Sequence, residues 1–341
     1  MSSPLSSKDI QNTLFTRIKS RLSKSESFVE VISELLNLSY DSAYRRIRGE
    51  TLLNIEELRV LSAHYKLSLD ELLLGVTNGM FFNYKSVRRS GLDSNVYFKE
   101  MAETMERLSE APNASMLYAA WDIPIFHYFN FPEVMLFKTY FWRKSVWDDP
   151  VLADKDFKLD ELMAEHGEII KKDGQRILDA YIKTPATEIW HDWTLESTLK
   201  QIEFGIDSGF FVKKEDYMVL FEQLYQLIEH VEDQAKAGFK FKYGQKPQKS
   251  TDNYELYLNE IFFLNNTIIA EADNMREVFV IHESVNYLTT TNPQFCEETA
   301  NWMQVQKKKS ILITNSSERE RNKFFKKQYN KIEKMMRRVM D

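Results

Sequence analysis

Histidines beside carboxylates are the side chains here that most readily suggest catalysis, because such groups bind metal ions or exchange protons. Two segments contain them, Glu-His-Gly-Glu at 165–168 and Glu-His-Val-Glu-Asp at 229–233. Neither has the spacing of a metalloprotease or a di-iron protein, and solvated helix faces commonly carry such clusters. Cys296, the single cysteine, has no catalytic motif around it. The sequence therefore predicts no enzyme, no metal site and no cofactor.

The composition is typical of a folded protein that does not act in a membrane. Hydrophobic residues make up 43% of the 341 positions and charged residues 28%, close to globular averages. No apolar run approaches the roughly 20 residues that span a bilayer, and the first residues lack the apolar core of a signal peptide. A single cysteine fits a reducing compartment. We expect a cytoplasmic protein of about two domains.

The net charge of −6 averages over regions of different sign. Residues 1–79 carry 10 basic and 10 acidic side chains, whereas residues 307–341 carry 12 basic and 4 acidic ones. The segment 94–306 has a net charge of −16. A basic tail beside an acidic body predicts either docking of the tail on the body or binding of an external anion, and we favour docking.

Residues 8–75 contain helix start signals at short intervals. In three of them a side-chain acceptor precedes a glutamate by three residues, a capping pattern: Ser27 with Glu30, Asn54 with Glu57 and Ser68 with Glu71. Ser39 can cap a further helix, and an amphipathic stretch precedes them all. These signals predict five helices, at about 9–22, 28–36, 40–48, 55–65 and 69–74.

The second and third predicted helices are joined by only three residues, 37–39, a connection typical of a helix-turn-helix. Residues 31–49, VISELLNLSYDSAYRRIRG, resemble the phage-repressor-like (XRE or Cro-type) helix-turn-helix transcriptional regulators. The family usually has Ala where this chain has Ser33, and Gly where it has Asn37. Because Asn tolerates the left-handed backbone conformation, we expect the turn to form.

The resemblance implies that helix 40–48 lies in the major groove of DNA. Ala43 and Ile47 then face the core of the domain. The side chains that project elsewhere are the candidates for reading bases: Tyr40, Asp41, Ser42, Tyr44, Arg45 and Arg48. The candidates for phosphate contacts lie near helix starts or in the following loop: Lys24, Ser27, Ser39, Thr51 and Asn54.

The rest of the chain is expected to form one larger domain. A linker at 77–94 separates a DNA-binding domain at 1–76 from an effector and dimerisation domain at 95–341. Eleven aromatic residues lie between 118 and 147, and we favour core packing over an aromatic ligand pocket. Residues rich in Ile, Val, Phe and Tyr predict a β-meander at about 254–290, and a basic helix is predicted at about 318–340.

The expected fold class is mainly α, with a five-helix helix-turn-helix domain followed by a larger α+β domain that is mostly helical and has a small antiparallel sheet. We expect a sequence-specific transcriptional regulator that binds double-stranded DNA as a homodimer, because one short helix reads only a few base pairs. The larger domain would sense an unidentified small-molecule or protein effector. The alternative is a protein-interaction or scaffold protein that docks a partner through the helical domain, which the zero net charge of residues 1–79 favours.

Overall fold

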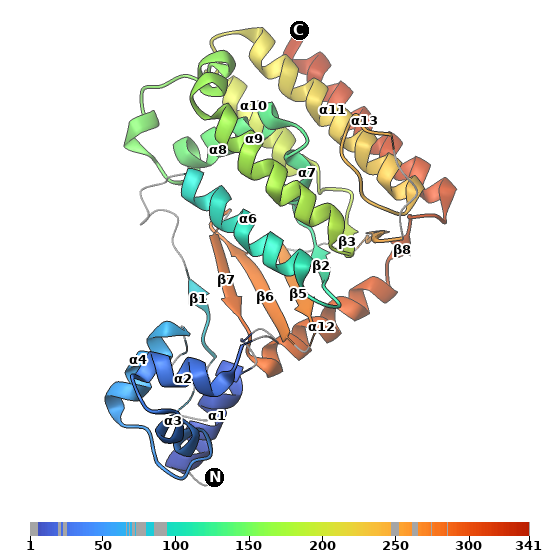
Figure 1. Cartoon of the computed structure of the whole chain (residues 1–341). Helices are drawn as coiled ribbons and strands as arrows, with labels where there is room; N and C mark the ends of the chain where they lie inside the picture. The colour runs from blue at the N-terminus through green and yellow to red at the C-terminus, as the bar shows by residue number, and fades with distance from the viewer. Residues whose placement is uncertain are drawn as a thin grey trace. The chain divides into compact units, whose positions relative to one another are not determined.

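The computed structural model divides the chain into two compact units, residues 1–82 and 83–341 (Figure 1). It describes residues 6–19, 26–65, 80–84, 94–246, 252–260, 265–273, 275–284 and 286–340, together with Leu22, Leu67, Leu69 and Leu72. Within these residues, every helix is too short or too polar to cross a membrane.

The described part of the first unit contains four helices whose apolar faces meet in one core. Leu14 and Ile18 of the first helix, Ile32 of the second, Ala43 of the third and Leu61 of the fourth are all buried there. Of the predicted helix at 69–74, only Leu69 and Leu72 belong to the described residues, both in helical conformation, and the predicted cap at Ser68 lies outside them. The four helices are α1 (Ser7–Lys19), α2 (Phe28–Leu36), α3 (Tyr40–Ile47) and α4 (Ile55–His64).

The capping predictions have different outcomes. Asn54 accepts a hydrogen bond from the Glu57 amide at 2.8 Å, and the Glu57 carboxylate accepts one from the Asn54 amide at 3.0 Å, so this capping box is confirmed. Ser39 caps α3 by accepting from the Ser42 amide at 3.3 Å. Ser27 occupies the first position before α2 but makes no capping bond, so the predicted box with Glu30 is wrong. Ser27 is exposed, and water can satisfy amides of an exposed first turn.

In the described part of the second unit, eight strands form one sheet in the order β1-β7-β6-β5-β2-β3-β4-β8. The neighbours β2, β3 and β4 are parallel, and all other neighbours are antiparallel. The predicted small antiparallel sheet is therefore wrong, although the unit is mostly helical. The strands are β1 (Asn83–Tyr84), β2 (Ser115–Ala119), β3 (Ala186–Trp190), β4 (Tyr254–Leu258), β5 (Thr267–Ala272), β6 (Met275–His282), β7 (Asn286–Thr290) and β8 (Ile311–Leu312).

The error arises from the short parallel strands β2 and β3. Both faces of these strands are covered, so their sequences lack the alternation that marks a half-exposed strand. β2 and β3 lie between β5 and β4, so only β5, β6 and β7 form the predicted meander. Parallel neighbours require crossover connections, and long helical segments supply them here.

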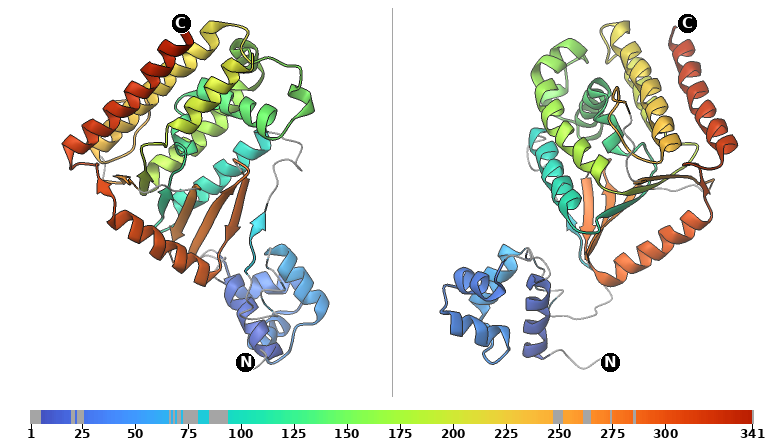
Figure 2. Two further views of the ribbon diagram at one scale, coloured as in Figure 1. Left: turned by 180° about the vertical axis from the view of Figure 1, so that it is seen from behind. Right: turned by 45° about the vertical axis from the view of Figure 1, so that its right-hand side comes forward.

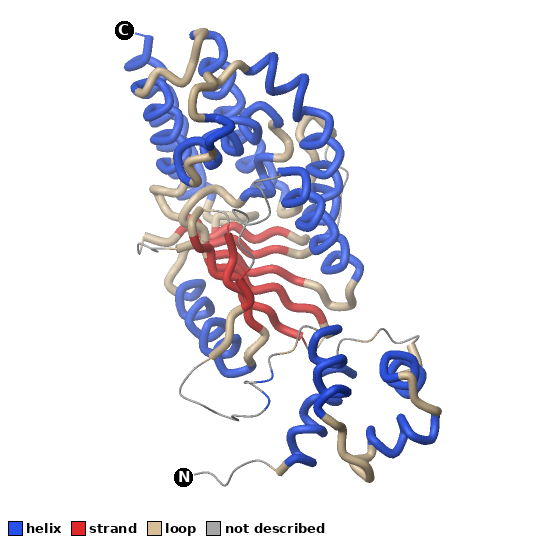
Figure 3. Tube along the Cα trace, turned by 90° about the vertical axis from the view of Figure 1, so that its left-hand side faces the viewer, coloured by secondary structure: helices blue, strands red, loops and turns tan. Residues whose placement is uncertain are grey.

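Helices cover one face of the sheet as a thick layer, and a single described helix, α12 (Pro293–Lys308), covers the other (Figures 2 and 3). Nine of the eleven aromatic residues between 118 and 147 are buried in the core beneath this layer, which confirms the packing interpretation. The layer consists of α6 (Ser94–Glu110), α7 (Ile125–Tyr128), α8 (Pro132–Phe141), α9 (Leu159–Lys183), α10 (Glu196–Asp207), α11 (Lys214–Ala237) and α13 (Glu318–Met340).

The basic helix α13 docks on acidic parts of the second unit. It packs along α11, as the right view of Figure 2 shows, and buries Phe325 and Ile332 in the core. Its Lys331 ammonium lies 3.1 Å from the Glu196 carboxylate of α10, and Arg338 pairs with Glu203 of the same helix. The expected docking of the basic tail on the acidic body is therefore confirmed.

Candidate nucleic-acid interface

The turn before α3 closes through backbone and side-chain hydrogen bonds. Asn37 has φ 49° and ψ 50°, the left-handed conformation that the sequence predicts for this position. The Leu38 amide donates to the Ser33 carbonyl at 2.9 Å, and the Ser33 hydroxyl donates to the Leu38 carbonyl at 2.6 Å. These bonds fix the direction in which α3 leaves the turn.

The two faces of α3 differ sharply. Ala43 is fully buried, and Ile47 packs against the core of the first unit. Ser42 is half-buried and contacts the Ser39 cap, its hydroxyl accepting from the Ser39 hydroxyl at 2.9 Å. The other five candidates for base reading are exposed: Tyr40, Asp41, Tyr44 and Arg45 of α3, and Arg48, its C-cap residue. We call these five the outer face of α3.

A buried ion pair, which the sequence analysis did not single out, holds α3 against α4. Arg46 donates to both carboxylate oxygens of Glu57, at 3.0 and 2.7 Å, and to the Ser42 carbonyl at 3.3 Å. The two side chains are only 16% and 11% exposed. Partial burial raises the pKa of Glu57, but the bonds from Arg46 and from the Asn54 amide outweigh it and hold the pKa below its usual range.

Gln11 of α1 fixes the loop that follows α3. Its side-chain amide donates to the carbonyls of Arg46 and Thr51 at 2.7 and 3.0 Å, and its side-chain oxygen accepts from the Leu53 amide at 2.7 Å. The partners lie 35 to 42 residues from Gln11 in the sequence, so no local pattern predicts these bonds. Together with the Arg46–Glu57 pair, they give α3 a fixed orientation.

The two arginines of the outer face remain accessible. Their only ion-pair partner in the described residues is Glu50, whose carboxylate oxygens lie 3.9 Å from Arg45 Nε and 3.4 Å from Arg48 Nε. All three side chains are at least 45% exposed, so water screens these pairs strongly. The Arg48 guanidinium carbon lies 5.6 Å from the centre of the Tyr44 ring.

Three of the five phosphate candidates are the N-cap residues of α2, α3 and α4, where exposed amides and the helix dipole favour anions. Ser27, Ser39 and Asn54 are all exposed, as is Thr51 in the loop after α3. The Asn54 oxygen and the Ser39 oxygen already accept capping bonds. Lys24 lies outside the described residues.

The two histidine clusters have different surroundings in the described structure. At 165–168, His166 Nε2 lies 3.6 Å from the exposed Glu165 carboxylate, as expected for a solvated face. The solvated-face expectation is wrong for His230, which is buried with its Nε2 2.8 Å from the Phe241 carbonyl. Burial lowers the pKa of His230 to about 4. The described residues contain no group of three or more metal-ligating side chains.

A buried carboxylate cluster in the second unit also escaped sequence analysis. Glu188 of β3 is fully buried, and each of its carboxylate oxygens lies 3.1 Å from His127 Nε2. It also accepts from Trp190 Nε1 at 2.8 Å, from the Tyr254 hydroxyl at 3.0 Å and from the Tyr181 hydroxyl. Burial raises the pKa of Glu188, but His127 and the hydroxyl donors lower it below its usual range. The donors satisfy the carboxylate inside the core.

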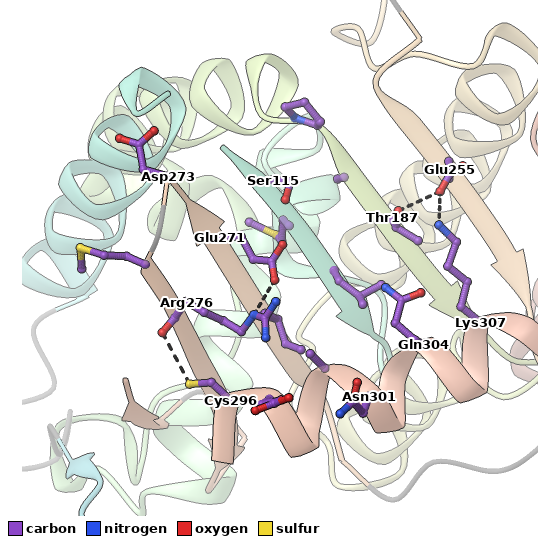
Figure 4. A pocket seen from close by; sticks show the side chains of 18 of the residues that line it. Ser115, Thr187, Glu255, Glu271, Asp273, Arg276, Cys296, Asn301, Gln304 and Lys307 are labelled. Carbon is purple, nitrogen blue, oxygen red and sulfur yellow. Dashed lines mark hydrogen bonds and ion pairs between the residues drawn. The ribbon is translucent and has the colours of Figure 1, made fainter. Parts of the chain in front are cut away.

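A cleft of about 960 Å³ lies between the sheet and α12 (Figure 4). Ion pairs occupy its walls: Lys307 lies 2.6 Å from Glu255, and Arg276 pairs with Glu271. The Cys296 thiol is buried against backbone carbonyls, and burial raises its pKa. A raised pKa favours the protonated thiol, which is the less nucleophilic form of cysteine.

Comparison of the chain with protein-family models, with curated proteins and with solved structures finds no match. The candidate interface rests on the geometry of α2, α3 and α4 and on the resemblance that residues 31–49 carry.

Proposed function

We propose that this chain is a sequence-specific DNA-binding transcriptional regulator that places α3 in the major groove. One observation carries the proposal: α3 is an eight-residue helix with a buried inner face, whose outer face presents two arginines, two tyrosines and an aspartate to solvent. An α-helix of this size enters the major groove, where side chains reach base edges. Bonds from α1 and α4 hold it in place before any ligand arrives.

Each outer-face residue has a chemical role in this proposal. Arg45 and Arg48 donate paired hydrogen bonds to guanine, and Asp41 accepts from a cytosine amino group. Ser27, Thr51 and Asn54 donate to phosphates from the ends of neighbouring elements, which sets the register of the helix on the duplex. Zero net charge in residues 1–79 does not oppose this, because affinity depends on local phosphate contacts.

We propose that the regulator acts as a homodimer on two half-sites, because a single short helix contacts too few base pairs for useful specificity. The second unit would supply dimerisation and the response to an effector. We propose no catalytic activity for it, because its buried carboxylate is held by donors within the protein and two lysine or arginine side chains of its cleft are paired with glutamates. One cysteine in 341 residues is typical of a reducing compartment, so we place the protein in the cytoplasm.

A protein-docking role for the first unit is the second candidate function. Leu52, in the loop after α3, and Ile55, the first residue of α4, are 52% and 86% exposed. Exposed apolar side chains together with arginine and tyrosine are typical of protein interfaces. The salt dependence of binding distinguishes the two functions, because phosphate contacts lose affinity steeply as salt rises.

Selection of binding sites from a random duplex library by the full-length protein tests the proposal. We expect a two-fold symmetric motif that Arg45→Ala/Arg48→Ala no longer selects. Arg59→Ala is the matched control, since Arg59 is an exposed arginine of α4 outside the outer face of α3. If the folded protein enriches no sequence, the base-reading assignments are wrong.

A further inference from the structure

Large apolar side chains gather on one segment of the first unit. Between residues 6 and 65, the described ones that are strongly exposed are Tyr40 at 58%, Tyr44 at 43%, Leu52 at 52% and Ile55 at 86%. The remaining described large apolar side chains of this stretch are buried or half-buried, most of them in the core. Exposed apolar groups that cluster beside a fixed helix indicate a surface that another molecule covers.

Two of these side chains belong to the outer face of α3. Tyr40 and Tyr44 are four residues apart, so their rings lie one helical turn from each other along the same stripe. Arg45 projects next to Tyr44, and Arg48 continues the stripe with its guanidinium near the Tyr44 ring. Along the chain, the stripe therefore presents the rings of Tyr40 and Tyr44 first and the arginines after them.

The major groove offers one apolar group to such rings. Adenine, guanine and cytosine present hydrogen-bond donors and acceptors there, and thymine adds a 5-methyl group. Rings that met only polar base edges would lose water contacts without gaining apolar ones. A thymine methyl group against each ring avoids this cost and buries apolar surface.

We propose that Tyr40 and Tyr44 read thymine methyl groups, so that the operator half-site carries thymines beside the guanine that Arg45 contacts. This inference rests on the proposed DNA-binding function. It gives Tyr40 and Tyr44 a preference for thymine that comes from their rings, because their hydroxyl groups alone would not distinguish thymine from other bases. The methyl contact comes from the ring, so phenylalanine preserves it and alanine removes it.

The test uses the full-length protein and the duplex most enriched in the selection from a random library. Each thymine of a half-site is replaced in turn by deoxyuridine, which removes the methyl group and keeps base pairing. We expect about a fourfold loss of affinity at each contacted thymine, the value for one buried methyl-sized group, and no loss at flanking thymines. 5-Bromodeoxyuridine, whose bromine is close to a methyl group in size, should restore the affinity.

Tyrosine variants assign each methyl group to a ring. Tyr44→Ala should bind the thymine and uracil duplexes equally well at its own position, whereas Tyr44→Phe should still prefer thymine. Tyr40→Ala should lose discrimination at a different thymine. Both side chains are exposed, so we expect these variants to fold, and circular dichroism checks this.

The outcomes separate this inference from the proposed function. If the protein selects a duplex but binds it equally well when all thymines are uracil, the methyl-reading inference is overturned and DNA binding stands. The same holds if alanine variants keep the preference for thymine. If no duplex is selected, both are overturned.

Discussion

The ion pair between Arg46 and Glu57 provides the most quantitative test of how α3 is positioned. In Glu57→Gln, Arg46 keeps a hydrogen-bond partner but remains a mostly buried cation without a counter-charge. Removal of one partner of a buried pair costs about 3–5 kcal/mol, and the retained hydrogen bond and partial exposure reduce this to about 2 kcal/mol. The free energy for opening α3 and α4 should fall by that amount.

Hydrogen exchange measured by mass spectrometry on the full-length protein follows this opening directly. A loss of about 2 kcal/mol accelerates exchange of the slow amides in α3 and α4 about 30-fold. Glu56→Gln is the matched control, because Glu56 is the adjacent glutamate and its pair with Arg59 is exposed, so the rates should not change. The second unit should also exchange at its original rates.

The pH dependence of exchange provides a second test of the Arg46–Glu57 pair. The folded pKa of Glu57 lies below its unfolded value, so its stabilising contribution is present above the usual carboxyl range and is lost as the pH falls through the folded pKa. The Glu57→Gln effect should therefore shrink at low pH. An acceleration below about threefold at neutral pH would refute the assignment of Arg46 and Glu57 as the positioning pair.

Three further predictions concern other residues. Glu50→Gln should raise the affinity for the selected duplex about two- to fivefold in a titration at fixed salt. The substitution removes the exposed carboxylate that pairs with Arg45 and Arg48 and that repels phosphate. Unchanged or weaker binding argues against DNA contacts by these arginines. Asn37→Ala should destabilise the first unit by about 1–2 kcal/mol in hydrogen exchange, whereas Asn37→Gly should not, because the position has φ 49°. The folded pKa of His230 is about 4 against an ordinary 6.5, so the free energy of unfolding should fall as the pH drops from 6.5 towards 4. His230→Gln should lose about 2 kcal/mol less of this free energy than the wild type between pH 7 and 5. Equal losses in both proteins would contradict this.

Local signals predicted the helices of the first unit where helix starts and turns form between residues close in the sequence. Asn54 and Glu57 form a capping box within one helical turn, and Asn37 closes a turn between adjacent helices. The positioning of α3 was not predictable in the same way. Arg46 pairs with Glu57 across 11 residues of sequence, and Gln11 bonds to backbone groups 35 to 42 residues away. A single arginine in a helix does not reveal which partner it binds.

The second unit shows where a single sequence stops being informative. Its helices follow their apolar periodicity, and the hairpins of β5, β6 and β7 join strands adjacent in the chain. β2 and β3 pair across crossover segments, and their five-residue length and double-sided burial leave no periodic signal. For the same reason the cluster around Glu188 could not be predicted, since His127 lies 61 residues away.

The central claim is that the outer face of α3 distinguishes one DNA sequence from another. The most direct measurement is the ratio of dissociation constants of the full-length protein for the selected duplex and for a scrambled duplex of equal length and composition, at physiological salt. The account predicts a ratio of about 1,000 or more for the wild-type protein and for Arg59→Ala, and a ratio at least about 30-fold lower for Arg45→Ala/Arg48→Ala. A wild-type ratio near one, or an unchanged ratio in the double variant, would contradict it.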